Sequence, residues 1–266
     1  MLVAVSGPPG VGKTHWIAQH LRQHNPENAR YLSPKTETLP LDAAWLGTEF
    51  PSLRVLQPGQ EAQLLDSLEG ITYLELPWYL DLAGIEPLLQ QTECVRVASP
   101  EENRVAILPP NSPETPWHNW ANQTHSGNPL PLPPDFHASP PQVHRSQLNG
   151  QVFDFASLAV FWYELLQGAY GEVIRAKGIL EIASGEAVYG DFVQGQINEE
   201  FAALDWPQWL QGRPQRLSGL EICGYQLQRE AIVQTLDDCC LSDEQLHHYQ
   251  QQIRASLDLE PEVTVV

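Results

Sequence analysis

The stretch GPPGVGKT at residues 7–14 decides the fold of the first part of this chain. It consists of Gly7, Pro8, Pro9, Gly10, Val11, Gly12, Lys13 and Thr14. The apolar run Leu2–Val5 precedes it and a helix-like stretch from His15 to Gln23 follows it, which is the strand–loop–helix setting of a phosphate-binding loop. Glycines let successive backbone N–H groups point at one phosphate, and the start of the following helix adds positive potential. The stretch therefore predicts nucleotide binding.

Two side chains of the loop have predicted chemical roles. Lys13 is expected to neutralise the charge of the β- and γ-phosphates, and the Thr14 hydroxyl to hold Mg²⁺. Lysine occurs elsewhere only at positions 35 and 177, which favours a function for the one inside the loop. We predict Lys13 as a catalytic and cofactor-binding residue and Thr14 as a metal ligand.

An acidic residue at the end of a later strand is the second candidate metal ligand. Residues 71–76 read as a buried parallel strand that carries Glu75, and such a strand commonly holds the second carboxylate linked to Mg²⁺. The alternative is a carboxylate at a sheet edge without a function. A buried glutamate needs a charged partner, and Mg²⁺ is one, so we predict Glu75 as a catalytic and metal-binding residue.

Composition excludes several classes of protein. The chain has 266 residues, a formal net charge of −19 and a pI near 4.7, which argues against nucleic-acid and anionic-membrane partners. No stretch has the length and apolarity of a transmembrane helix or a secretory signal. Four cysteines are too few for a disulfide framework in a chain this long. A cytoplasmic protein is expected.

Strands that alternate with helices predict a parallel α/β sheet of three layers over residues 1–108, of the P-loop NTPase type. The further strand candidates are 29–32, 93–97 and 104–108, and the further helix candidates are 60–68 and 82–90. Residues 109–149 are rich in proline and predict a linker or a covering segment. Trp117, Trp120 and Phe136 in that segment are expected to pack partly on a domain surface.

A second, small α/β domain is predicted over residues 150–241, followed by a helical tail over 242–266. Its expected elements are a helix from Phe155 to Leu165, strands at 172–182, 187–197 and 217–225, and a helix at 226–238. Ser242 followed by Gln245 predicts a capping box at the start of the last helix.

Two stretches of the second domain resemble the C-terminal domain of the CobW family of P-loop GTPases and metallochaperones. They are GEVIRAKGILEI at 171–182 and RLSGLEICGYQLQREAIVQTLDDCC at 216–240. Arg175, Lys177 and Gly178 match the RxKG strand of the family, and Gly224, Leu227, Arg229 and Glu230 match its later strand-to-helix passage. The resemblance implies a P-loop domain followed by a CobW-type C-terminal domain, with GTP as the nucleotide.

The chain departs from the family pattern at three places. The cysteine-rich metal motif is missing, because no cysteine precedes Cys94. The Asn-Lys-x-Asp guanine selector is missing, although residues 111–114 stand at about the right place for a degenerate version. The family glycine three residues after the strand-end acid is replaced by Trp78. These departures predict weak base discrimination and slow hydrolysis.

The histidines and cysteines do not predict a tight zinc site, because a tetrahedral site needs four converging ligands. His118, His125, His137 and His144 are scattered, and Cys239 and Cys240 are adjacent at the end of a helix. Arg175 and Lys177 alternate along one strand and face the same side. That side is either a basic strip used in function or a solvated face paired with Glu172 or Glu181.

Two functions remain open from the sequence. The first is a nucleotide-binding protein that takes GTP, or ATP, with Mg²⁺. Such a protein would be a slow GTPase linked to metal or cobalamin homeostasis, with a client metalloprotein as partner. Thr36, Thr38 or Thr48 would then contact Mg²⁺ in the triphosphate state. The second is a degenerate, non-catalytic GTPase-like interaction protein whose partner surface is the Trp-bearing proline segment.

Overall fold

The protein is described by a computed structural model that divides into two compact units, Met1–Pro134 and Asp135–Val266. The structure describes residues 1–24, 26–34, 39–57, 59–60, 70–95, 103–130, 136, 139–196 and 200–259. The expected helix at 60–68 lies largely outside these residues, and so do residues 260–266 of the expected tail. Each unit has its own sheet and its own apolar core.

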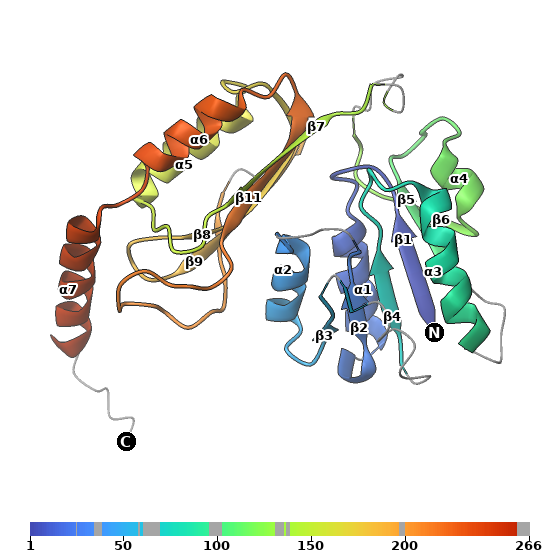
Figure 1. Ribbon diagram of the computed structural model, residues 1–266, viewed down its shortest axis with the longest axis horizontal. Coiled ribbons are helices and arrows are strands. Elements are labelled where there is room, and N and C mark those ends of the chain that lie inside the picture. Colours follow the sequence, from blue (N-terminus) through green and yellow to red (C-terminus); the bar gives the residue numbers. More distant parts are fainter. Residues whose placement is uncertain are drawn as a thin grey trace. The chain divides into compact units, whose positions relative to one another are not determined.

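The first unit is built on a six-stranded sheet whose strands are all parallel. The strands are β1 (Leu2–Ser6), β2 (Arg30–Leu32), β3 (Arg54–Val55), β4 (Thr72–Glu75), β5 (Asn103–Leu108) and β6 (Gln123–Ser126). Their order is β3-β2-β4-β1-β5-β6, so β1 is flanked by β4 and β5 (Figure 1). Ligands of open parallel sheets bind at the carboxyl ends of the strands, and the predicted phosphate loop follows β1 at this edge.

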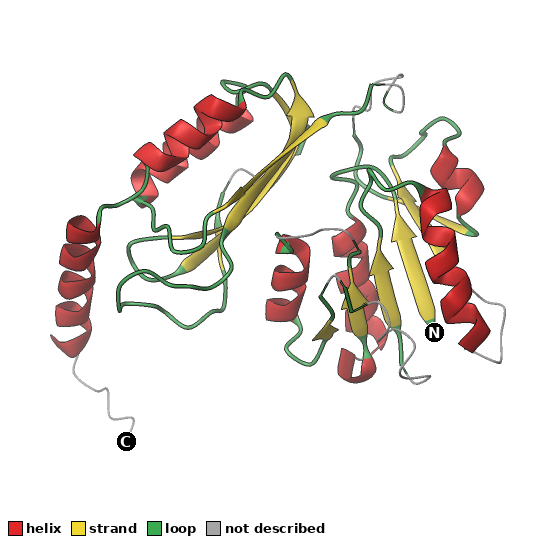
Figure 2. Ribbon diagram, in the orientation of Figure 1, coloured by secondary structure: helices red, strands yellow, loops and turns green. Residues whose placement is uncertain are grey.

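Helices cover both faces of this sheet, which makes the three predicted layers (Figure 2). They are α1 (Lys13–His24), α2 (Leu41–Glu49), α3 (Leu82–Val95) and α4 (Pro116–Trp120), with a short 3₁₀ helix at Pro26–Asn28. Ile17 and Leu21 of α1 pack with Val3 and Val5 of β1 on one face. Ile85 and Leu89 of α3 pack on the other face with Leu2 and Ala4 of β1. Alternate residues of β1 thus serve opposite cores.

The strand expected at residues 93–97 is wrong for its first three residues, because α3 continues to Val95; residues 96–97 lie outside the described part of the chain. Ile85 and Leu89 lie four residues apart on the buried face of this helix. A short apolar run does not distinguish a strand from the end of a helix. Here α3 runs without a break from Leu82 past Pro87 to Val95.

The proline-rich stretch 109–149 contributes regular elements to both units. Its first part forms α4 and the edge strand β6 in the first unit, and its last part forms the edge strand β7 (Gln142–Gln147) in the second. Trp117 and Phe136 are buried, as expected for aromatic residues that pack on a domain. Prolines fit this role because they are tolerated at helix starts and beside edge strands.

The second unit holds a five-stranded antiparallel sheet in the order β10-β9-β8-β11-β7. Its strands besides β7 are β8 (Glu172–Glu181), β9 (Ala187–Val193), β10 (Ala202–Ala203) and β11 (Gly219–Tyr225). The predicted strands match β8, β9 and β11, whereas β7 and β10 were not foreseen. A register shift between Cys223 and Gly224 interrupts the pairing of β11 with β8.

Three helices accompany this sheet: α5 (Phe155–Leu166), α6 (Arg229–Asp238) and α7 (Asp243–Leu259). Leu158 and Trp162 of α5 and Ile232 of α6 share one core with the strands. The predicted capping box of the last helix is confirmed, since the Ser242 backbone N–H donates to Gln245 and the Gln245 backbone N–H donates back to the Ser242 hydroxyl. None of the described helices is long and apolar enough to cross a membrane.

Candidate functional site

The loop at residues 7–14 has the backbone curvature that its glycines predict. Gly7, Gly10 and Gly12 have φ angles of +143°, +78° and +98°. Residues with a Cβ atom adopt such positive φ angles only with steric strain. A Cβ atom on Gly7 would lie 2.1 Å from the carbonyl oxygen of Ile107, so the loop also runs against β5. The sequence therefore needs glycine here for conformation and for close approach.

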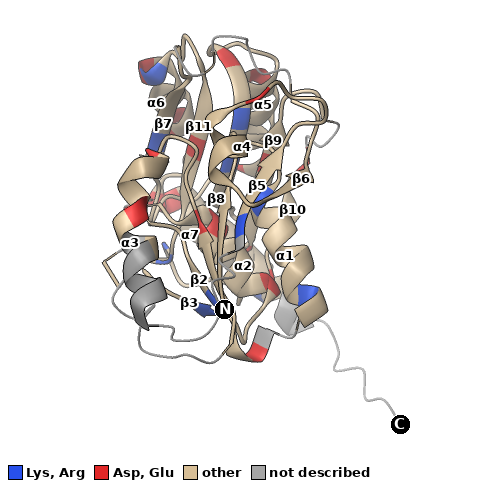
Figure 3. Ribbon diagram, turned by 90° about the vertical axis from the view of Figure 1, so that its right-hand side faces the viewer, with Lys and Arg blue, Asp and Glu red and all other residues tan. Residues whose placement is uncertain are grey.

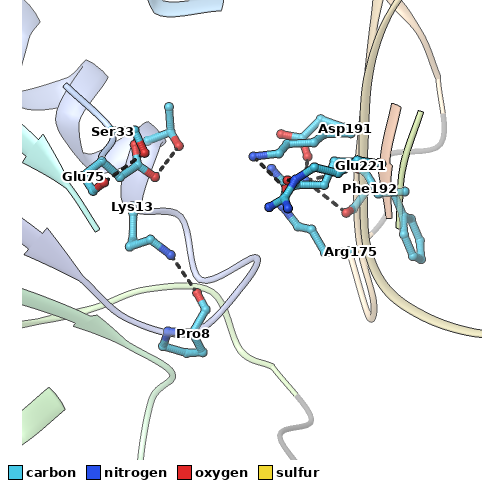
Figure 4. A network of polar contacts seen from close by, with 12 residues as sticks. Pro8, Lys13, Ser33, Glu75, Arg175, Asp191, Phe192 and Glu221 are labelled. Atoms are coloured by element: carbon cyan, nitrogen blue, oxygen red, sulfur yellow. Dashed lines mark hydrogen bonds and ion pairs between the residues drawn. The ribbon is translucent and has the colours of Figure 1, made fainter. Parts of the chain in front are cut away.

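Lys13 is the first residue of α1 and is buried to 8% exposure. Its ammonium donates hydrogen bonds to the carbonyl oxygens of Gly7, at 3.0 Å, and Pro8, at 3.1 Å. Figure 4 shows this side chain folded back over the loop toward Pro8. The positive charge thus lies inside the curve of the loop, where a phosphate group would also meet the N-terminus of α1.

Thr14 and Glu75 meet at the end of the sheet, as the prediction of a shared metal requires. The Thr14 hydroxyl donates to Glu75 Oε1 over 2.9 Å, and Glu75 is 5% exposed. Glu75 ends β4, which lies between β2 and β1, and pairs in register with Val5. Glu75 thus lies on an internal strand, and its roles in metal binding and catalysis stay predictions.

Glu75 also accepts hydrogen bonds from the end of β2. The Tyr31 hydroxyl donates to Glu75 Oε2 over 2.9 Å, and the Ser33 hydroxyl donates to the Glu75 backbone carbonyl over 3.0 Å. The Thr14 and Tyr31 hydroxyls thus both donate to this buried carboxylate. Neither Tyr31 nor Ser33 was singled out from the sequence, since both are common residue types at the end of a short strand.

A loop far along the chain also supports the phosphate loop. Asn128 donates from its side chain to the Gly10 carbonyl over 2.9 Å and from its backbone to the Val11 carbonyl over 3.0 Å. A Cβ atom on the preceding Gly127 would lie 2.3 Å from the Val11 carbonyl oxygen. Sequence reasoning missed this pair, although the tripeptide Gly127-Asn128-Pro129 is a turn signal.

The basic residues of β8 are paired with acidic residues on neighbouring strands. Arg175 bonds to the carboxylate of Asp191 and to the Phe192 carbonyl, and Lys177 lies 3.3 Å from Glu221 (Figure 4). The partners proposed from the sequence, Glu172 and Glu181, are wrong for these two residues. They lie on the same strand as the basic residues, whereas ion pairs in a sheet form across strands.

The bidentate partner of Glu181 is Arg216, whose Nε and Nη2 atoms lie 2.5 and 2.8 Å from the two carboxylate oxygens. The guanidinium also stands over the Trp206 ring, 5.2 Å from its centroid. The Glu181 side chain is 1% exposed, so the carboxylate of this ion pair is almost completely buried. Charged residues occur on the ribbon of both units (Figure 3).

A family model matches the second unit over residues 149–240, and it is described as the cobalamin synthesis protein cobW C-terminal domain. The second unit is therefore similar to the CobW C-terminal domain over these residues. The match confirms the predicted resemblance of this stretch to the C-terminal domain of the CobW family. The predicted fold class, a parallel sheet domain followed by a small α/β domain, is what the two sheets and their helices show. The RxKG strand of the CobW C-terminal domain is β8, and Arg229 and Glu230 begin α6.

Two solved structures also align with the chain. The Zn(II)-bound YjiA GTPase from E. coli is 13% identical, with 90% of this chain and 98% of that chain covered and a TM-score of 0.32. A Zn(II)-bound triple mutant of the YjiA GTPase is 16% identical, with the same coverage and TM-score. No curated protein matches the chain significantly in sequence. At these TM-scores the two alignments carry no weight beyond the match of the CobW C-terminal domain.

The positions at which the chain departs from the CobW pattern have ordinary structural roles. Asn111 has a φ of +57° in the turn that follows β5, where the Ser112 backbone N–H donates to the Pro109 carbonyl over 3.2 Å. Asparagine tolerates this left-handed conformation, and its side chain is exposed. Trp78 lies in the turn after β4 and makes an edge-to-face contact with Tyr79.

The three threonines considered for the switch are not equivalent. Thr36 and Thr38 lie outside the described residues. Thr48 lies in α2, and its hydroxyl donates to the Ala44 carbonyl one turn earlier in the same helix. The choice among them stays open.

Within the described ranges, no group of three or more histidine, cysteine, aspartate or glutamate residues could hold a metal ion. His20 stacks on Trp16 and on His24, and its Nδ1 lies 2.6 Å from the Tyr73 hydroxyl. Burial and the neighbouring His24 and His125 lower the pKa of His20 below its ordinary value of 6.5. The His20 ring therefore packs α1 against β4.

The adjacent cysteines behave as core residues. Cys239 is 6% exposed, and Cys240 is partly buried beside Gln151. Burial raises the pKa of the Cys240 thiol to about 11, which disfavours the thiolate that a metal requires. Their predicted role as incidental core residues fits these surroundings.

Proposed function

We propose that the first unit binds a nucleoside triphosphate together with Mg²⁺, and that GTP or ATP occupies the loop at residues 7–14. The observation that carries the proposal is the position of Lys13. Its ammonium lies inside the curve of a glycine-rich loop, 3.0 Å from the Gly7 carbonyl and at the start of a helix. A buried lysine at this place supplies the charge that bound phosphates require.

The residues at the sheet end fit Mg²⁺ as the accompanying cation. Mg²⁺ prefers oxygen ligands and is bound by one or two side chains together with phosphates and water. Thr14 and Glu75 offer a hydroxyl and a carboxylate oxygen 2.9 Å apart. When bound, Mg²⁺ would neutralise phosphate charge, with Thr14 holding it directly and Glu75 through water.

The base of the nucleotide is proposed to contribute little to affinity. The guanine selector of CobW proteins is absent from the sequence, and residues 109–112 form a turn with Asn111 exposed. A site without a paired polar contact to the base discriminates weakly. GTP and ATP should bind within about tenfold of each other, which corresponds to about 1.4 kcal/mol.

Hydrolysis is proposed to be slow. Trp78 stands where the family glycine would free a backbone N–H for the γ-phosphate. The transition-state charge would then be stabilised chiefly by Lys13 and Mg²⁺. We expect about 10⁻⁴ to 10⁻³ turnovers per second without a partner, as for an unassisted small GTPase. Through this cycle the protein would act on a client metalloprotein in metal or cobalamin homeostasis.

The competing function as a non-catalytic interaction protein draws less support from the structure. It places the partner surface on the Trp-bearing proline segment, but Trp117 is 4% exposed and belongs to α4. The Trp120 indole nitrogen is buried as well, and Arg104 stands over its ring. These aromatic residues hold α4 on the sheet.

Calorimetric titration of the full chain with GTP, ATP and GDP, in Mg²⁺ and in EDTA, tests the proposal. Lys13→Ala should weaken triphosphate binding by about 30- to 150-fold, since a charge-assisted contact of about 2–3 kcal/mol is lost. Arg22→Ala is the matched control, because Arg22 carries the same charge on the same helix and is exposed beside Glu49. Its affinity should equal that of the wild type.

Identical titrations of wild type and Lys13→Ala would contradict the proposal. So would a wild type that takes up none of the three nucleotides. A hundredfold preference for GTP would instead reveal a base-recognition element, and Asn111 would be the first residue to substitute.

A further inference from the structure

Tyr31 occupies a position in the core that an apolar side chain could fill. It lies in the middle of β2, pairs in register with Tyr73 of β4 and is completely buried. Its ring packs with residues of α1 and β1 in the main core of the first unit. A buried tyrosine costs stability unless its hydroxyl finds a partner, and here that partner is Glu75.

The direction of the hydrogen bond follows from the surroundings of the hydroxyl. An ionised carboxylate has only acceptor oxygens, so the Tyr31 hydroxyl is the donor in its 2.9 Å contact with Glu75 Oε2. Glu75 is the acceptor.

The two oxygens of the Glu75 carboxylate have different partners. Oε1 accepts from Thr14 at the start of α1, and Oε2 accepts from Tyr31 of β2, each over 2.9 Å. Two donors from different elements fix the rotation of the carboxylate about its last bond. Loss of either donor would free that rotation.

The end of β2 holds the backbone of Glu75 as well. The Ser33 hydroxyl, two residues after Tyr31, donates to the Glu75 carbonyl over 3.0 Å. Figure 4 shows this contact between Ser33 and Glu75. Both the side chain and the main chain of the acid are thus held from β2 and the residue that follows it.

We infer that Tyr31 is a positioning residue, which holds the Glu75 carboxylate in the orientation that Mg²⁺ and its water ligands need beside Thr14. The inference rests on the proposed function. Mg²⁺ demands near-ideal octahedral geometry, so a carboxylate that turns freely loses more affinity than one that is held. Tyr31 would act through Glu75, without contact to nucleotide or metal.

The test separates Mg²⁺-dependent from Mg²⁺-independent binding. Tyr31→Phe keeps the ring that fills the core and removes only the hydroxyl. It should lower triphosphate affinity in Mg²⁺ by about tenfold, the size of one hydrogen bond to a charged group, and leave affinity in EDTA within about twofold. In the Glu75→Gln background the same substitution should have no further effect, because the two residues act as a unit.

Tyr73→Phe is the matched control. It removes a tyrosine hydroxyl from the paired position on the adjacent strand, where the partner is His20 instead of Glu75. Its Mg²⁺-dependent affinity should equal that of the wild type.

The outcomes distinguish the two proposals. A wild type that binds no nucleotide overturns the proposed function. A wild type that binds, with a Tyr31→Phe variant that loses equal affinity in Mg²⁺ and in EDTA or none in either, overturns the role of Tyr31 alone. Additive losses in the double variant would also contradict it.

Discussion

The two units use polar side chains in different ways. In the first unit the contacts join distant segments around one loop: Thr14 and Glu75 are 61 residues apart, and Gly10 and Asn128 are 118 apart. In the second unit the contacts hold strands to one another or to a flanking loop: Glu221 of β11 meets Lys177 of β8 and Arg145 of β7 in register, and Arg216, just before β11, meets Glu181 of β8.

This difference predicts different consequences of substitution. Contacts that converge on the loop at residues 7–14 fix the positions of its backbone N–H donors, so their loss should first lower the affinity for the ligand. Contacts along a sheet face hold strands together, so their loss should appear first in stability. The following three substitutions test the comparison, in decreasing order of expected effect.

The largest effect is expected for Arg216→Ala in the second unit. The substitution leaves the carboxylate of Glu181, 1% exposed, without its bidentate partner. Breaking a buried ion pair in this way costs about 3–5 kcal/mol. Hydrogen exchange read by mass spectrometry should show faster exchange in β8 and β9, with exchange in β1 unchanged.

Arg145→Ala provides the matched control for this change. Arg145 is 30% exposed, and its partner Glu221 keeps Lys177 at 3.3 Å. The loss should be below about 1 kcal/mol. Equal losses in the two variants would show that burial of the acid does not decide the stability of this sheet.

An intermediate effect is expected for Gly127→Ala in the first unit. The new Cβ atom would lie 2.3 Å from the Val11 carbonyl and 2.7 Å from Ile107 Cγ2, so the phosphate loop must shift. Overpacking of this kind costs about 2 kcal/mol. If the loop carries that cost, triphosphate affinity measured by calorimetry falls about 30-fold.

Gly84→Ala in α3 is the control for the added methyl group. The nearest atom to its Cβ, on Asp81, is 3.9 Å away, which is ordinary contact. Affinity should not change. A Gly127→Ala variant with wild-type affinity but reduced stability would show that the close approach at Gly127 supports the fold and not the binding of phosphate. That result would contradict the proposed difference between the two units.

The smallest effect is a pH dependence that centres on His20. Its folded pKa lies below the ordinary 6.5, so neutral His20 contributes stability above that pH and the contribution is lost as the pH falls through and below it. The loss should be below about 1 kcal/mol, because the ring is partly exposed.

Hydrogen exchange of α1 and β4 between pH 7.5 and 5.5 measures this loss. His20→Gln should reduce the pH dependence, whereas His15→Gln, on the exposed side of the same helix, should retain it. The interpretation is wrong if both variants behave alike.

The sequence was sufficient for the elements whose signal is local. The glycines and Lys13 predicted the loop, and the apolar run at residues 71–76 predicted a buried parallel strand with a terminal acid, Glu75. Both signals lie within a few residues, and the parallel topology then requires that the two strand ends meet at one edge of the sheet.

The contacts that sequence reasoning missed depend on edge strands and on register. β6 reads QTHS and is exposed at all four positions, so no apolar pattern marks it as the strand that delivers Asn128. Alternation predicted that Arg175 and Lys177 face the same side. Their partners Asp191 and Glu221 follow only from the pairing of β8 with β9 and β11, which a single sequence does not reveal.

The central position of β1 has a consequence for the order in which the protein can fold during synthesis. Both neighbours of β1 come late: β4 begins at Thr72 and β5 at Asn103. The phosphate loop leaves the ribosome before either partner of its flanking strand, so β1 can pair with β4 only after Glu75 has emerged and with β5 only after Leu108 has emerged. Because such long-range pairing must precede any bound nucleotide, a nascent chain cut short before β5 should be unable to capture a triphosphate.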